Sequence, residues 1–237
     1  MKIATWNVAY GRGEANKLRI EKIREINADV WVLTETHDSL DLGVDFASFS
    51  TTPREKKGNR NLDDRSRWVT IWAKRNLGPV EVGTGDKDRT SACSVQFGDQ
   101  KLVVFGTVLP WYTDTERPSY GEELEKQADD WGQLRDKNGG LLCVAGDFNL
   151  NLGGPHYYGS AVNKAKMLKA LERTHLVACT CFCRTQTHDV NREFGLIDHI
   201  AISQSLDKRA RIDSIWPKRD EMNRILSDHE GVAVTIN

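Results

Sequence analysis

The chain has 237 residues, of which 39% are hydrophobic and 28% are charged, and its formal net charge is −1. At about 100–200 residues per domain, this length allows one large domain or two small ones, with a core that needs no disulfide or structural metal. Intrinsic disorder, collagen-like repeats and disulfide-dense mini-proteins are therefore excluded. The charge near zero also argues against bulk electrostatic binding of nucleic acid, so an anionic substrate has to meet local charge or a bound metal.

The sequence carries no sign of export or of a membrane partner. No apolar run approaches the ~20 residues that a membrane helix needs, and the first residues turn polar too early for a signal peptide. Five cysteines without an export signal are typical of free thiols in a reducing compartment. We therefore expect a cytoplasmic protein that acts as a monomer and has no membrane partner.

Short apolar runs rich in Val, Ile and aromatic residues predict seven strands. They are Lys2–Trp6, Val30–Thr34, Trp68–Ala73, Lys101–Val108, Leu141–Ala145, Leu196–Ile202 and Gly231–Ile236. Segments with helical periodicity lie between them, at Leu18–Ile26, Glu122–Asp136 and Lys164–Thr174. Strands that alternate with amphipathic helices predict an α/β layered sandwich. Since no linker or internal repeat interrupts the pattern, we expect one domain over residues 1–237.

The stretch from Thr51 to Arg67 differs from the rest of the chain in having no apolar periodicity. It carries six Lys and Arg residues against three Asp and Glu residues, a net charge of +3. Such a segment is either a solvated loop or a basic loop that faces the substrate. Both interpretations fit the sequence.

Polar side chains interrupt or follow the ends of several predicted strands. The residues are Asn7, Glu35, Asp147, Asn149, Asp198, Asp228 and His229. Any one of them alone could be a cap, a turn residue or an exposed charge. Acidic side chains are rarely buried unless they are paired or bind a metal, however, and strand ends in α/β proteins can meet at one rim. Asp198 stands apart, because a carboxylate between Ile197 and Ile200 needs a partner, and a histidine is a suitable one.

These residue types share one chemistry. Carboxylates and amides are hard oxygen ligands for Mg²⁺ or Mn²⁺, and the histidine adds an acid–base group beside them. A metal of this kind polarises a phosphoryl oxygen and stabilises the attacking and leaving oxygens. The set therefore suits the hydrolysis of a phosphate ester, in which positioning and electrostatics supply most of the catalysis.

The order of these motifs resembles the endonuclease/exonuclease/phosphatase superfamily, which has the deoxyribonuclease-I-like fold. The matching segments are Thr-Trp-Asn7-Val, Leu-Thr-Glu35-Thr, Gly-Asp147-Phe-Asn149, Ile-Asp198-His-Ile and Ser-Asp228-His229. They follow the family's order from residue 3 to residue 236, so the resemblance covers essentially the whole chain. It implies a four-layered α/β sandwich in which two facing mixed β-sheets are flanked by helices and the site lies at one rim.

The resemblance also implies a set of metal ligands. Glu35 would be the principal ligand, with Asn7 and Asp228 beside it, and the metal would be Mg²⁺ or Mn²⁺. The implied substrate is a phosphate ester.

The other matching residues would carry the catalysis. Asp147 and Asn149 would orient and activate the attacking water. His229 would contact the scissile phosphate as a general base or an electrostatic stabiliser, held by Asp198. The resemblance leaves open whether Asp147 or His229 takes the proton of the water.

One segment departs from the family pattern. Nuclease members often carry an Asn or His after the strand that corresponds to Val103–Leu109, and this chain has Pro-Trp111-Tyr112 there. Tyr112 or Thr107 would have to supply the missing hydrogen-bond donor. Trp111 either packs or, with Tyr112, offers a surface on which a base can stack. His156, on a Gly-rich loop, is a further candidate for the substrate groove.

We therefore expect a divalent-metal-dependent phosphodiesterase, a nuclease that acts on DNA or RNA by direct attack of water without a covalent intermediate. One alternative is a phosphatase or phosphodiesterase of a small molecule or lipid headgroup, and another is a binding module that keeps the fold without catalysis. The basic stretch and the Trp-Tyr pair favour a polyanion, whereas the net charge of −1 favours a smaller substrate.

Overall fold

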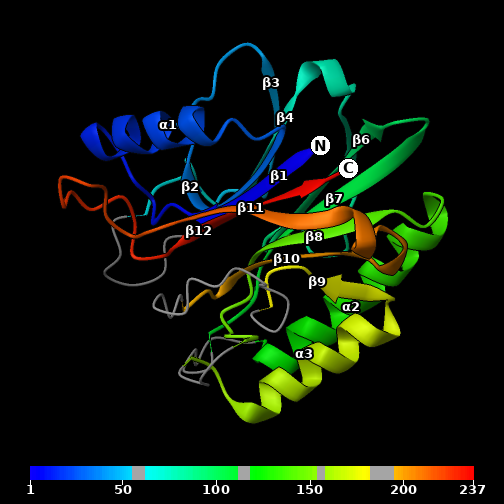
Figure 1. Ribbon diagram of the computed structural model, residues 1–237. Helices are drawn as coiled ribbons and strands as arrows, with labels where there is room; N and C mark the ends of the chain where they lie inside the picture. Colours follow the sequence, from blue (N-terminus) through cyan, green and yellow to red (C-terminus); the bar gives the residue numbers. More distant parts are fainter. Residues whose placement is uncertain (55–61, 112–117, 154–157, 182–194) are drawn as a thin grey trace.

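The computed structural model describes residues 1–54, 62–111, 118–153, 158–181 and 195–237. Its strands form two six-stranded sheets (Figure 1). The first sheet has the order β11 (Ala210–Trp216), β12 (Gly231–Ile236), β1 (Lys2–Asn7), β2 (Val30–His37), β4 (Ser66–Lys74), β3 (Phe46–Ser50). The second has the order β5 (Val80–Val82), β6 (Thr90–Phe97), β7 (Gln100–Val108), β8 (Leu142–Asp147), β10 (Asp198–Ser203), β9 (Leu176–Ala178).

Both sheets are mixed. In the first sheet β1 and β2 are parallel, and in the second β7 and β8 are parallel, while the other described neighbours are antiparallel. Parallel neighbours need a crossover, which helices usually provide. Here α1 (Glu14–Ile26) connects β1 to β2, and α2 (Tyr120–Lys137) connects β7 to β8.

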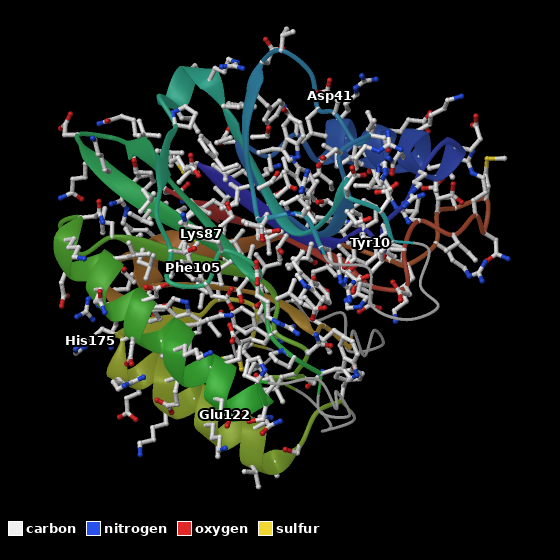
Figure 2. All side chains as sticks on the ribbon, turned by 180° about the vertical axis from the view of Figure 1, so that it is seen from behind. Tyr10, Asp41, Lys87, Phe105, Glu122 and His175 are labelled. Carbon is white, nitrogen blue, oxygen red and sulfur yellow. The ribbon has the colours of Figure 1, made fainter. Side chains whose placement is uncertain are left out.

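Helices cover the outer face of each sheet, which completes four layers. The helix α1 lies on the first sheet, and α2 and α3 (Ala161–Arg173) run side by side over the second (Figure 1). Figure 2 shows Phe105 between the second sheet and α2, where its ring meets Trp131 edge-on at 6.3 Å. Two short 3₁₀ helices, η1 (Arg75–Leu77) and η3 (Gln204–Arg209), complete the described elements. The predicted four-layered sandwich is confirmed.

The two sheets pack directly against each other through a shared apolar core. This core contains β-branched and other aliphatic side chains from both sheets, with Val32 and Ile71 on one side and Val104 and Ile200 on the other. The sheets approach closely at Gly106, where an added Cβ would lie 2.6 Å from a methyl carbon of Val69. Burial of this face is the main source of stability for such a sandwich.

The strands that face the inter-sheet core change from apolar to polar at the same end. Their inward-facing residues are Ile3, Thr5 and Asn7 on β1, Cys143, Ala145 and Asp147 on β8, and Ile202, Ile200 and Asp198 on β10. Alternate residues of a strand face the same side, so the pleat itself directs the last polar side chains into the gap between the sheets. This end is opposite to the two chain termini, which lie side by side (Figure 1).

Among the helices that the structure describes, none is long and apolar enough to cross a membrane.

Candidate active site

The site contains two buried carboxylates from neighbouring strands. Asp147 and Asp198 are register partners on β8 and β10, and they are 2% and 0% exposed. Asp147 accepts hydrogen bonds from the backbone N–H of Asn149 at 2.8 Å and from Nδ2 of Asn7 at 3.2 Å. Since Asn7 belongs to the first sheet, this contact joins the two sheets at their polar end.

His229 makes a second connection between the sheets. Its Nδ1 donates to Oδ2 of Asp198 at 2.5 Å, and its side chain is 13% exposed. The backbone around His229 is also held, because its N–H donates to Oγ of Ser227 at 3.1 Å and its carbonyl accepts from the Trp6 indole at 3.2 Å. Ser227 in turn donates to the carbonyl of Asn7 at 2.6 Å. The imidazole is thereby fixed in position and orientation.

The electrostatics of the site favour a protonated His229. Burial opposes the imidazolium, but the carboxylates of Asp198 and Asp147 outweigh it and raise the pKa of His229 to about 10. Burial also raises the pKa of Asp147 to about 7; His229 acts against this shift, and Asp198 and Glu35 add to it. At neutral pH the site therefore holds a cationic imidazolium next to a carboxyl group that is ready to exchange a proton.

Strained backbone positions two of the polar residues. Glu35 and Asn149 have φ angles of 51° and 48°, in the left-handed region that few residues other than glycine adopt. Gly146 has a φ of 140°, and an added Cβ there would lie 2.0 Å from the carbonyl oxygen of Thr107. Such strain persists where surrounding contacts hold it, and it is concentrated at functional sites. For Asn149 those contacts are the Leu109 carbonyl, at 2.8 Å from Nδ2, and the Tyr158 hydroxyl, at 3.2 Å from Oδ1.

The donor chemistry of the site fits a hard divalent cation. The ligand atoms of Asp147, Asp198 and His229 lie within 4.8 Å of one another. A protonated imidazole cannot bind a metal, however, because metal ligands must be deprotonated. Oxygen donors remain, among them those of half-buried Glu35, of Asn7 and of exposed Asp228, and oxygen donors are what Mg²⁺ and Mn²⁺ prefer.

All seven polar residues singled out in the sequence lie at this end of the sandwich. Asp228 is exposed, and its carboxylate contributes to the raised pKa of His229. Ser227 is a residue whose role the sequence did not reveal, although it stands in the quoted Ser-Asp-His motif and is buried there. Its hydroxyl is placed to hold both Asn7 and His229.

Of the three residues expected to bind substrate, the structure describes one. Trp111 is half-buried and packs against the inter-sheet core, while Tyr112 and His156 lie outside the described residues. Thr107 does not supply the hydrogen-bond donor that is missing where the chain departs from the family pattern. It is fully buried and its hydroxyl donates to Oε1 of Gln127 at 2.5 Å, so it supports α2 rather than the site.

Solved structures with the same fold include two endonucleases. An AP endonuclease from Archaeoglobus fulgidus is 17% identical with a TM-score of 0.69, and the match covers 100% of this chain and 99% of that one. The endonuclease domain of TRAS1, a telomere-specific non-LTR retrotransposon, is 14% identical with a TM-score of 0.69, covering 100% and 98%. The human Nocturnin catalytic domain with a bound sulfate anion is 14% identical with a TM-score of 0.67, covering 100% and 94%.

The sequence comparisons add the family. No curated protein sequence matches the chain. The profile of the Endonuclease/Exonuclease/phosphatase family matches residues 4–229, which spans every motif described above from Asn7 to His229. The chain belongs to the endonuclease/exonuclease/phosphatase family.

Proposed function

We propose that the chain is a divalent-metal-dependent phosphodiesterase of the nuclease type that cleaves DNA or RNA, with residues 1–237 acting as one catalytic domain. Family membership supports a phosphoester hydrolase. The observation that carries the proposal is the Asp198–His229 pair, 2.5 Å apart, beside the buried carboxyl of Asp147. A fixed imidazolium next to a group that can take a proton suits a substrate whose negative charge increases in the transition state.

The proposed metal ligands are Glu35, Asn7 and Asp228, and the proposed metal is Mg²⁺ or Mn²⁺. The Oδ1 atom of Asn7 accepts from the backbone N–H of Ala9 at 2.9 Å and retains a second lone pair for a cation. When bound, the metal would polarise the phosphoryl oxygen and neutralise charge on the substrate.

The residues of the chain would then carry the proton and orient the water. Asp147 and Asn149 hold the water, and Asp147 accepts its proton as the water oxygen attacks phosphorus and the bond to the leaving oxygen breaks. A base works best with a pKa near the working pH, which favours Asp147 over His229 for this role. His229, protonated and held by Asp198, stabilises the charge on the phosphoryl oxygens through Nε2–H.

Hydrolysis by the purified protein tests the proposal. Substrates are a chromogenic phosphodiester, a chromogenic phosphomonoester, and single- and double-stranded oligonucleotides, each with Mg²⁺, Mn²⁺ or a chelator. We expect diester cleavage that needs the metal and falls about 10²–10⁴-fold in Glu35→Gln and His229→Gln. Asp213→Asn, a carboxylate at the far end of the first sheet that pairs with Lys2 at 2.9 Å, is the matched control.

Four outcomes overturn the proposal. Undiminished hydrolysis in Glu35→Gln and His229→Gln excludes the site, and undiminished hydrolysis in chelator excludes the metal. If the protein cleaves only the monoester, it is a phosphatase. If it cleaves nothing and calorimetry detects no Mg²⁺ or Mn²⁺ binding, the non-catalytic module is the better interpretation.

A further inference from the structure

Two buried polar side chains lie on the inner face of α1, where an amphipathic helix usually buries apolar ones. Asn16 and Arg19 are each 5% exposed, and with Ile23 they form the buried stripe of this helix. Arginine is almost never buried to this extent unless it has a partner. The catalytic steps proposed above use neither polar side chain, so the buried cation of Arg19 needs an explanation of its own.

The guanidinium group of Arg19 holds the segment that carries the last family motif. Its Nε donates to the carbonyl of Leu226 at 2.7 Å in a buried hydrogen bond, which is strong because the donor is charged. The next residue, Ser227, donates to the carbonyl of Asn7 at 2.6 Å, and Asp228 follows it in the chain. Arg19 therefore fixes the backbone directly before a proposed metal ligand.

The same guanidinium group packs against the turn that follows Asn7, another proposed ligand. A Cβ added to Gly11 would lie 1.0 Å from Nη1 of Arg19, so only glycine leaves room for the charged group at this point of the turn. The turn is also connected to Glu35, because the N–H of Tyr10, labelled in Figure 2, donates to the carbonyl of Glu35 at 2.6 Å. One side chain thus lies between the segments that carry the three proposed metal ligands.

Asp228 supplies negative charge that offsets the burial of Arg19. Burial lowers the pKa of the Arg19 guanidinium, and the carboxylate of Asp228 acts against this shift. The Asp228 side chain is exposed, and its Oδ1 accepts a hydrogen bond from Oγ of Ser227 at 3.3 Å. An exposed side chain keeps several rotamers unless its neighbours restrict it. The attraction of a fixed cation reduces this freedom.

We propose that Arg19 is a positioning residue for the metal site, which holds the turn after Asn7 and the segment before Asp228 in the arrangement that the cation binds. The inference rests on the metal-dependent function proposed above, and it gives Arg19 no contact with the metal or the substrate. Ligands that are already in place lose little conformational freedom when the ion binds, so a preorganised site binds it more tightly.

Two physical effects of Arg19 on metal affinity have opposite signs. A cation near the site repels a divalent ion, so its removal would tighten metal binding if charge alone mattered. If Arg19 positions the ligands, its removal weakens metal binding, because the loosened segments must be ordered when the ion binds. The direction of the change therefore distinguishes positioning from a simple effect of charge.

Calorimetry of Mn²⁺ binding to the purified protein gives this direction without any turnover. We expect Arg19→Met to raise the Kd about tenfold, as the loss of a residue that supports metal ligands does. Arg19→Lys keeps the charge and one donor for the Leu226 carbonyl, so it should recover part of the affinity. Arg24→Met changes an exposed arginine in the last turn of the same helix, and as the matched control it should leave the Kd unchanged.

Gly11→Ala tests the position of the guanidinium group at constant charge. The backbone of Gly11 is not in the left-handed region, so it can accept alanine, but the added methyl group has to displace the Arg19 guanidinium. We expect the Kd for Mn²⁺ to rise in this variant as it does in Arg19→Met. This variant also decides the matter if Arg19→Met does not fold.

Rates on a chromogenic phosphodiester separate a loosened metal site from general damage. In Arg19→Met the Mn²⁺ concentration for half-maximal rate should rise about tenfold. The kcat at saturating Mn²⁺ should stay within about threefold, because His229 keeps its hydrogen bonds to Ser227 and Asp198. Melting curves in chelator measure the cost of the substitution to the fold alone.

An unchanged or lower Kd in Arg19→Met, or in Gly11→Ala where Arg19→Met does not fold, overturns the positioning role even if the wild type hydrolyses phosphodiesters. A lower Tm in chelator with an unchanged Kd also overturns it, since Arg19 then supports only the fold. If the wild type binds Mn²⁺ and cleaves no phosphodiester, the proposed function fails and the Kd values still decide the role of Arg19. If the wild type binds no Mn²⁺, both proposals fail.

Discussion

Two histidines on opposite faces of the second sheet show how a partner decides the charge of a buried side chain. His229 meets Asp198 between the sheets, whereas His199, the residue after Asp198, faces the helix layer. His199 lies between the Thr180 hydroxyl and the Leu150 carbonyl, each at 2.9 Å. Burial lowers the pKa of His199 to about 4, while the carboxylates beside His229 raise its pKa to about 10.

Burial favours the neutral imidazole at both positions, so burial does not explain the difference. The hydrogen-bond partners explain it. A carbonyl can only accept, so His199 donates from Nε2 to the Leu150 carbonyl and accepts at Nδ1 from the Thr180 hydroxyl. With one nitrogen donating and the other accepting, the ring is neutral. His229 faces a carboxylate and becomes a cation. The comparison separates a histidine that supports the scaffold from one that is placed to meet an anionic substrate.

The largest expected effect is a loss of catalysis. We expect it when His229 is replaced and not when His199 is replaced. His229→Gln removes the imidazolium and should lower kcat about 10²–10⁴-fold. His199→Gln keeps the site and should change kcat less than about threefold, because its ring contacts only the region behind the sheet. Steady-state rates on a chromogenic phosphodiester measure both. Equal losses in the two variants would remove the distinction.

The contribution of His229 to the stability of the folded protein should decrease as pH rises. The folded-state pKa of His229 is above the unfolded value of 6.5, so its contribution is fully present below pH 6.5 and is lost towards pH 10. Removing one partner of a buried ion pair costs about 3 kcal/mol, or roughly 6–12 °C in Tm for a chain of this size. Melting curves in chelator should therefore show the largest gap between wild type and His229→Gln near pH 6, and a smaller one at pH 10.

The contribution of His199 to the stability of the folded protein should show the opposite dependence on pH. Its folded-state pKa is depressed, so its contribution is present above pH 6.5 and is lost as pH falls towards 4. A shift from 6.5 to about 4 corresponds to about 3 kcal/mol over this range. Unfolding by urea should show that His199→Gln flattens the acid limb of the stability profile. The basic limb should stay as in the wild type, and a flattened basic limb would contradict the assignment.

Much of the fold followed from local pattern. The seven continuous apolar runs are all strands and the three periodic segments are all helices, because buried strands and amphipathic helices differ in hydrophobic period. The strands β3 and β11 escaped detection since they lie at sheet edges and alternate between half-buried and exposed residues. The strand β6 mixes Ser, Thr and Gln with apolar residues, and β5 and β9 have only three residues each.

The site was predictable in its residue types and not in its geometry. A strand-end carboxylate such as Asp198 is conspicuous in sequence because it interrupts an apolar run. The left-handed backbone of Glu35 and the role of Ser227 depend on contacts between distant segments. The same holds for Arg54, which the sequence did not distinguish from the other basic residues between Thr51 and Arg67. Only the fold shows that it stacks on Trp68 while Arg67 is neutralised by Asp38.

The smallest expected effects come from the two hydroxyl groups that support the histidines. Thr180→Val leaves Nδ1 of His199 and the backbone N–H of Ile200 without their partner, at a cost of about 1–3 kcal/mol. Ser227→Ala removes bonds to the Asn7 carbonyl and the His229 N–H at a similar cost.

Only the serine variant should also affect the reaction, because misplacing a catalytic group lowers kcat while a loosened scaffold lowers Tm alone. We expect kcat to fall about tenfold in Ser227→Ala and to stay within about twofold in Thr180→Val, with Tm lowered in both. Rates measured at a temperature well below both transitions separate the two quantities. Ser227→Thr keeps a hydroxyl at this position and should restore most of the rate. A loss of rate in Thr180→Val equal to that in Ser227→Ala would show that the two sides of the second sheet are coupled.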